Sequence, residues 1–190
     1  MFTNELESIL PEIRAYARML CSNRDTADDI VQNACLKAWK ARTSFDPKRG
    51  SFRAWMFTIT RNEFLQLVRK QRPVDYYDPA EFEYRLIEDC QLDNRSACSD
   101  AIQALFKLSS EQRDVFILVL AAGYSYEEAA AICKCSVGTI KSRINRARSK
   151  LAEILSNDQE TASNAQNQSI AFHGLDTIFG RVDELVKTAA

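Results

Sequence analysis

Apolar residues along this chain recur at intervals of three and four positions instead of alternating with polar ones. That spacing places them on one face of an α-helix and predicts an all-helical (all-α) protein. The first apolar stripe lies between Leu6 and Leu20, so we expect a helix there. A second helix is predicted to begin with Thr26 as its N-cap and to run to about Ala41.

Prolines and glycines divide the rest of the pattern into segments. A loop ends near Gly50, and a third helix is predicted from about Ser51 to Arg72, directly before Pro73. Residues 73–95 are rich in carboxylates and contain two prolines. This composition indicates an acidic linker between two helical parts.

Helical spacing resumes near Ser96, and Gly123 predicts a turn within the second helical part. Its predicted core residues are Leu105, Leu108, Val115, Phe116, Leu118 and Val119. The polar stretch from Ser156 to Ser169 is predicted to be flexible, and a short amphipathic helix is expected from Leu175 to Val186. We therefore expect two small helical domains, 1–72 and 96–155, with the linker 73–95 between them and a tail over 156–190.

Residues 125–151 predict two helices joined by a tight turn at 134–136. One face of the second helix is apolar and consists of Ile140, Ile144, Ala147 and Leu151. Positions 141–150, in contrast, contain five basic residues and no acidic one. A helix of this kind suits the major groove of DNA, because Arg and Asn form paired hydrogen bonds to guanine and adenine. An ordinary amphipathic helix pair is the alternative.

The net charge of -1 conceals an uneven distribution along the chain. Residues 37–72 contain 10 basic and 2 acidic residues, and residues 101–156 contain 8 basic and 5 acidic residues. The segments 1–36, 73–100 and 157–190 are each net acidic. Basic blocks with interleaved aromatic side chains are typical of nucleic-acid surfaces, but solvated helix faces give the same pattern.

The composition argues against several functional classes. Apolar runs are shorter than the roughly 20 residues of a membrane-spanning helix, and the first ten residues lack a secretory signal, so we expect a cytoplasmic protein. The six cysteines are expected to stay reduced, and no metal or cofactor is expected. With a single histidine, His173, and no glycine-rich phosphate loop, we expect no enzymatic activity.

Two stretches resemble the extracytoplasmic-function sigma factors, the minimal sigma-70-type subunits that direct bacterial RNA polymerase to promoters. Residues 27–41 (ADDIVQNACLKAWKA) and 52–64 (FRAWMFTITRNEF) resemble region two of that family, and residues 108–151 resemble region four. The two regions together are more diagnostic than a helix-turn-helix alone. Residues 10–32 are also similar to the general-stress subgroup, whose members are held by a small anti-sigma protein.

The resemblance implies roles for individual residues. Docking on core polymerase would involve Asp28, Asp29 and Gln32. Recognition and melting of the minus-ten element would involve Phe45, Lys48, Arg49, Phe52, Arg53, Trp55, Arg61, Asn62 and Arg69. Recognition of the minus-35 element would involve Arg113, Gly138, Thr139, Lys141, Ser142, Arg143, Asn145, Arg146 and Arg148. Helix capping also accounts for the two aspartates, and Trp55 could equally be a core residue.

The implied partners are core RNA polymerase, promoter DNA and an anti-sigma protein, without membrane insertion. Two other functions stay open: a sigma-mimicking decoy that binds an anti-sigma protein, and a stand-alone helix-turn-helix regulator. The basic residues between Lys37 and Arg72 favour a DNA-binding sigma factor over a decoy. The segment from Leu175 to Val186 is predicted to dock on a helical domain of this protein or of a partner.

Overall fold

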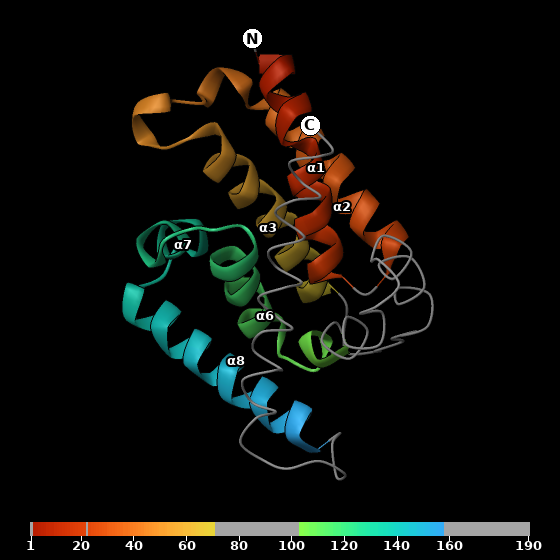
Figure 1. Cartoon of the computed structure of the whole chain (residues 1–190). Coiled ribbons are helices and arrows are strands. Elements are labelled where there is room, and N and C mark those ends of the chain that lie inside the picture. Colours follow the sequence, from red (N-terminus) through yellow and green to blue (C-terminus); the bar gives the residue numbers. More distant parts are fainter. Residues whose placement is uncertain (1, 22, 71–102, 158–190) are drawn as a thin grey trace.

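The computed structural model describes residues 2–21, 23–70 and 103–157, and all secondary structure within these ranges is helical (Figure 1). This result confirms the predicted all-α fold class. The predicted linker at 73–95 and the predicted amphipathic helix at 175–186 lie outside the described residues.

The helices α1 (Phe2–Leu20), α2 (Arg24–Lys40) and α3 (Phe52–Lys70) pack against one another and form the N-terminal helical group (Figure 1). Two short turns, η1 (Arg42–Ser44) and η2 (Pro47–Arg49), connect α2 to α3 in the predicted loop. The apolar stripe of α1 lies inside this group, since Ile9, Ile13 and Leu20 are buried.

The start of α2 differs from the prediction, because its N-cap is Asn23 and not Thr26. The Asn23 side chain accepts a hydrogen bond from the Thr26 backbone N–H at 2.9 Å. Asn is among the strongest N-cap residues, and its short amide reaches the first free N–H groups of the helix. Thr26 is therefore an ordinary residue of the first turn.

The C-terminal helical group contains a short helical turn at 103–106, then α6 (Ser110–Phe116), the π-helical turn η4 (Ile117–Ala121), α7 (Tyr126–Cys133) and α8 (Val137–Asn157). Ser109 and Gln112 form a capping box at the start of α6, and Ser125 and Glu128 form another at the start of α7. The predicted turn at Gly123 is confirmed by its φ of 70°, which favours glycine. The π-helical turn was not predicted from the sequence.

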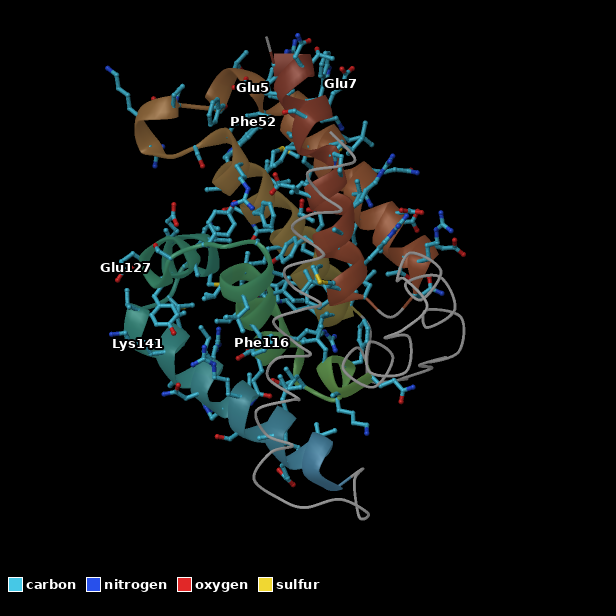
Figure 2. The ribbon with its side chains drawn as sticks, viewed as in Figure 1. Glu5, Glu7, Phe52, Phe116, Glu127 and Lys141 are labelled. Atoms are coloured by element: carbon cyan, nitrogen blue, oxygen red, sulfur yellow. The ribbon has the colours of Figure 1, made fainter. Side chains whose placement is uncertain are left out.

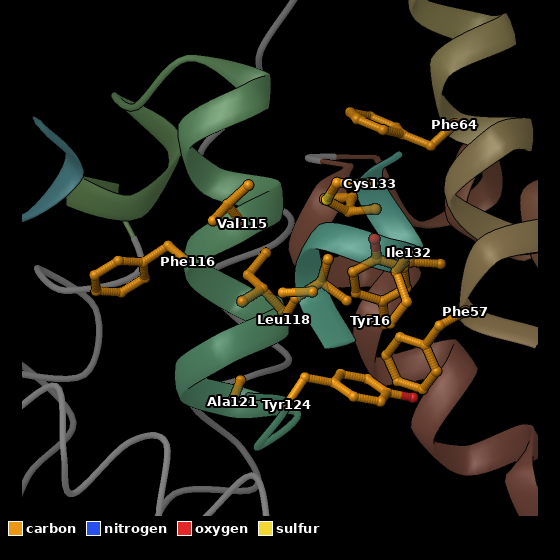
Figure 3. Close-up of a cluster of buried hydrophobic side chains, with 14 of the residues drawn as sticks. Tyr16, Phe57, Phe64, Val115, Phe116, Leu118, Ala121, Tyr124, Ile132 and Cys133 are labelled. Carbon is orange, nitrogen blue, oxygen red and sulfur yellow. The ribbon is translucent and has the colours of Figure 1, made fainter. Parts of the chain in front are cut away.

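The predicted core of the C-terminal helical group is confirmed with one exception. Leu105, Leu108, Val115, Phe116 and Leu118 are buried, whereas Val119 is only half-buried. Figure 3 shows side chains from this core beside Tyr16, Phe57 and Phe64 of the N-terminal helical group. In the part of the chain that the structure describes, α3 packs on α7 and α1 packs on α6, so the two helical groups are in direct contact.

Candidate nucleic-acid interface

The helix α8 has one buried and one exposed face, as the sequence predicts. Ile140, Ile144, Ala147 and Leu151 are each no more than 1% exposed. The exposed positions that were predicted to meet the minus-35 element are Gly138, Lys141, Ser142, Asn145, Arg146 and Arg148. Figure 2 shows Lys141 at the outer edge of the molecule, near the start of α8. This exposed face offers hydroxyl, amide and guanidinium groups to a ligand.

A tight turn sets the angle between α7 and α8. Lys134 ends α7 in the left-handed conformation, with φ of 53° and ψ of 48°. Ser136 then accepts a hydrogen bond from the Thr139 backbone N–H at 3.2 Å and caps the start of α8. Thr139 is half-buried, and its hydroxyl lies 2.9 Å from that of Ser136. Thr139 therefore takes part in the cap at the N-terminus of α8, which limits its hydroxyl as a contact for DNA.

Two arginines of α8 make contacts within the C-terminal helical group. Arg143 pairs with Glu111 of α6 at 2.5 Å, which ties α8 to α6. Arg146 folds back along its own helix and donates to the Ser142 backbone carbonyl at 3.3 Å. Its position is exposed and the bond is long, so the guanidinium can be redirected towards a ligand at little cost.

An aromatic cluster lies where α3 begins. Phe45, Phe52 and Trp55, all predicted for the minus-ten element, have ring centroids 5.2 to 5.7 Å apart. Phe52 is buried, whereas Phe45 and Trp55 are half-buried. Phe2 of α1 also belongs to this cluster, with its ring 5.4 Å from Phe52 and 5.9 Å from Trp39. Sequence reasoning missed Phe2, because only the fold brings it next to α3.

The predicted minus-ten basic residues of η2 and α3 fall into two sets. Lys48 and Arg49 in η2, and Arg69 near the end of α3, are exposed. Arg53 and Arg61 instead face the C-terminal helical group and are half-buried and buried, respectively. Asn62, which follows Arg61, is half-buried.

Arg53, Arg61 and Arg113 were predicted to contact DNA, and in this structure each also joins the two helical groups. Arg61 Nε donates to Asp114 Oδ2 at 2.6 Å. Arg53 donates to the Ala122 carbonyl at 2.7 Å, and Arg113 donates to the Leu20 carbonyl at 3.0 Å. The sequence gives no local signal for these pairings.

Asp114 has no exposed surface, and its second oxygen accepts a hydrogen bond from the Tyr16 hydroxyl at 2.6 Å. Burial raises the pKa of the Asp114 carboxyl, and the charge of Arg61 opposes this rise. Burial also raises the pKa of Tyr16 well above its ordinary value, and the charge of Asp114 adds to the effect. Tyr16 therefore stays protonated and donates its hydroxyl hydrogen to the Asp114 carboxyl.

The predicted docking residues lie along α2, where Asp29 and Gln32 are exposed and Asp28 is half-exposed. Asp28 lies 3.9 Å from Arg18 and 3.8 Å from Arg24. Such solvent-exposed pairs contribute little to stability, so Asp28 can exchange them for a partner. Leu36 and Trp39 continue the same face and are 58% and 47% exposed. Their place one and two turns after Gln32 is a signal that sequence reasoning overlooked.

Within the described residues, Cys21, Cys35, Cys133 and Cys135 are free thiols, as predicted for these four. The same part of the chain contains no group of His, Cys, Asp and Glu that could hold a metal ion. None of its helices has the length and apolar character needed to cross a membrane.

Comparisons with known proteins agree with the two-part architecture. Residues 6–74 match the family Sigma-70 region 2, and residues 100–151 match Sigma-70, region 4. The extracytoplasmic-function (ECF) RNA polymerase sigma factor EcfG of Rhodopseudomonas palustris is 42% identical over 152 residues, which cover 80% of this chain and 83% of the relative. The RNA polymerase sigma factor CnrH of Cupriavidus metallidurans is 35% identical over 144 residues, which cover 70% of this chain and 75% of the relative.

Two solved structures share the fold. The sigma factor RpoE in complex with the anti-sigma factor NepR from Bartonella quintana has a TM-score of 0.64 and 39% identity, covering 82% of this chain and 96% of that one. CnrH in complex with the cytosolic domain of CnrY has a TM-score of 0.63 and 30% identity, covering 83% of this chain and 88% of that one. Since both sigma-70 regions are matched in order and the relatives align over most of their length, this chain belongs to the extracytoplasmic-function group of RNA polymerase sigma factors.

Proposed function

We propose that this sigma factor binds core RNA polymerase through α2, opens the minus-ten element with the N-terminal helical group and reads the minus-35 element with α8. In this proposal residues 1–72 form region two and residues 96–155 form region four. The observation that carries it is the exposed face of α8, where Lys141, Asn145 and Arg146 stand above a fully buried apolar stripe.

Side-chain chemistry supports the role of α8. Asn145 and Arg146 can each form two hydrogen bonds to a base edge in the major groove, and so can distinguish base pairs. Lys141 and Arg148 lie to either side and suit phosphate oxygens, which hold the helix in register on the duplex. The capped turn before α8 fixes its approach angle.

The aromatic cluster supports the role of the N-terminal helical group. A base that leaves the duplex loses its stacking, and contact with an aromatic ring restores part of that energy. Phe45 and Trp55 are half-buried, so they are partly accessible to such a base. Lys48 and Arg49, in the loop before α3, provide positive charge near the cluster for the phosphates, and Arg69 is a further exposed cation near the opposite end of α3.

The exposed face of α2 supports docking on polymerase. It combines the carboxylates Asp28 and Asp29 with the apolar side chains of Leu36 and Trp39. Charged groups around exposed apolar residues are typical of a protein-binding surface, and acidic groups select a basic partner.

The solved relatives in complex with NepR and CnrY support an anti-sigma protein as a further partner of this chain. Similarity to EcfG supports the predicted family, and the place in the general-stress subgroup stays a prediction from residues 10–32. We further propose that the protein acts in the cytoplasm, as a transcription initiation factor without catalytic activity or cofactor of its own.

Reconstitution with core RNA polymerase tests the function directly. The purified chain should bind core enzyme, form open complexes and support run-off transcription on a subset of a promoter panel. A decoy would bind an anti-sigma protein but form no open complex, and a stand-alone regulator would bind duplex DNA without core enzyme. Either of those results would reject the proposal.

A further inference from the structure

The two helical groups meet at a buried carboxylate. It belongs to the C-terminal helical group and accepts hydrogen bonds from the N-terminal helical group. Asp114 of α6 has no exposed surface. Its two oxygens accept hydrogen bonds from Tyr16 of α1 and Arg61 of α3, both at 2.6 Å. A buried carboxylate is stable only when paired, so this contact orients the two groups specifically.

Two more arginines cross the same boundary. Arg53 of α3 donates to the Ala122 carbonyl at 2.7 Å, and its guanidinium lies over the Tyr124 ring at 4.4 Å. Arg113 of α6 crosses in the opposite direction and donates to the Leu20 carbonyl at 3.0 Å. Donors from both groups therefore meet acceptors in the other group.

Aromatic rings in tilted and edge-to-face contact pack beside these polar contacts. Phe57 lies between Tyr16 and Tyr124, with ring centroids 4.8 Å and 5.2 Å away (Figure 3). All three residues are no more than 5% exposed. The boundary is thus a closed interface of aromatic rings with charged groups inside it.

This interface uses Arg53, Arg61 and Arg113, three of the cations assigned to promoter DNA. A guanidinium that donates to a buried carboxylate or a carbonyl cannot give the same hydrogens to a phosphate. The exposed face of α8 takes no part in the interface, since Lys141, Asn145 and Arg146 remain exposed. Closure therefore leaves the exposed face of α8 free, but it occupies Arg53 and Arg61 of the proposed minus-ten set and Arg113 of the proposed minus-35 set.

We propose that Asp114 is a latch that holds regions two and four together in the free protein, and that opening of the minus-ten element requires it to release Tyr16 and Arg61. The second half of this proposal rests on the proposed function, whereas the latch itself is measured without polymerase or DNA.

Asp114→Asn and Tyr16→Phe test the latch in the full chain. The first keeps the size of the side chain but leaves the buried Arg61 without its counter-charge, and the second removes a single hydroxyl. Glu63→Gln is the matched control, because Glu63 pairs with Lys37 at 2.5 Å inside the N-terminal helical group. All three variants are first compared with the wild type by circular dichroism.

Energy transfer between dyes at the exposed positions Lys40 and Lys150 reports the separation of the groups, with the dyes attached through non-natural amino acids. We expect longer distances in Asp114→Asn, a smaller shift in Tyr16→Phe and no shift in Glu63→Gln. Unchanged distances in both Asp114→Asn and Tyr16→Phe would overturn the proposal that Asp114 holds the two helical groups together. If Asp114→Asn loses its helical content, the Tyr16→Phe result decides.

Titration with a forked DNA that has a single-stranded minus-ten element tests the second half, using unlabelled protein. If Asp114→Asn opens the closed form, its affinity for the forked DNA should rise by about 3- to 10-fold. The gain on a minus-35 duplex should be smaller, because Arg113 is the one predicted minus-35 residue that the interface holds. Longer distances without a gain on forked DNA would overturn the competition between closure and promoter opening. Failure of the wild type to bind core polymerase would instead reject the proposed function and leave the distance result intact.

Discussion

Asn145 and Arg146 differ from Arg69 in the part of a promoter that each can recognise. The first two lie on the exposed face of α8 and suit base edges, whereas Arg69 is an exposed cation near the end of α3. Asn145→Ala or Arg146→Ala should weaken binding by ~1–3 kcal/mol on a matched minus-35 element and less on a mismatched one. Arg69→Ala should weaken binding on all sequences alike and lower the salt dependence by about one phosphate contact.

Equilibrium titrations on matched and mismatched duplexes at several salt concentrations separate the two kinds of contact. An equal loss on every sequence for Arg146→Ala would remove its base-reading role. An unaltered salt dependence for Arg69→Ala would remove its phosphate contact.

The burial of a residue could be predicted from the sequence where its neighbours within the same helix determine it. It could not be predicted where it depends on residues far away in the sequence. The buried stripe of Ile140, Ile144 and Ala147 follows from helical periodicity alone, so the sequence predicted it correctly. Tyr16 and Arg61 meet Asp114 across 98 and 53 positions of sequence, and no periodicity encodes such a pairing. The basic character of Arg61 was visible in the sequence, but its burial was not.

Two roles are open for the acidic residues of α2: docking on polymerase, and helix capping alone. Leu36 is 58% exposed on the same face as Asp29 and Gln32. If polymerase covers this face, Leu36→Glu loses the burial of the exposed part of the leucine side chain, worth about 1–2 kcal/mol or roughly 5- to 30-fold in Kd. Fluorescence titration against core polymerase measures this loss.

Val68→Glu is the control for Leu36→Glu. Val68 is also exposed, at 38%, but lies near the end of α3. A general effect of new negative charge would weaken both variants equally and would contradict a docking site on α2. Weaker binding by Leu36→Glu alone would support it.

Phe2 gives α1 a part in the minus-ten site that its sequence position did not suggest. Its ring contacts Phe52 and Trp55 at the start of α3, at 5.4 Å and 6.4 Å. Each aromatic pair contributes about 0.5–1.5 kcal/mol, so Phe2→Ala should loosen the cluster. We expect weaker binding of a single-stranded minus-ten oligonucleotide and altered tryptophan emission.

Binding of a minus-35 duplex provides the internal comparison for Phe2→Ala. It should not change, because α8 lies in the other helical group. Unaltered affinity for the single strand would limit Phe2 to a structural role.

Helix caps also show what the sequence can and cannot predict for a single element. The capping boxes at Ser109 and Ser125 depend on residues three positions apart, whereas the choice of Asn23 over Thr26 as N-cap needed the observed hydrogen bond.

For the molecule as a whole, periodicity and the uneven charge were enough to predict an all-α protein in two helical parts. The contact between these parts was not predicted, because it depends on side chains that meet only after both have folded. The π-helical turn between α6 and α7 was also missed, since helical periodicity does not distinguish a π-turn from an α-helix.

Buried thiols give the whole chain a specific response to alkaline pH. Burial raises the pKa of Cys21 and of Cys133 from about 9 to about 12, and the nearby Asp114 adds to the rise at Cys133. The unfolded chain loses these protons near pH 9, whereas the folded chain keeps them up to about pH 12. The folded state thus binds more protons in this window, and the free energy of unfolding falls as the pH rises through it.

Each buried thiol should contribute a decrease of about 1.4 kcal/mol per pH unit above pH 9, because one proton is lost only on unfolding. Denaturant titrations under reducing conditions between pH 8 and pH 10.5 measure this slope. Cys21→Ala should be less stable at pH 8, since it removes a buried side chain, but its stability should fall less steeply with pH. Cys135→Ala, at a half-buried position, is the control for the loss of a thiol as such, and it should keep the pH dependence of the wild type. The same slope in Cys21→Ala and in the wild type would show that the Cys21 thiol ionises equally in the folded and unfolded states, contrary to its burial directly after α1.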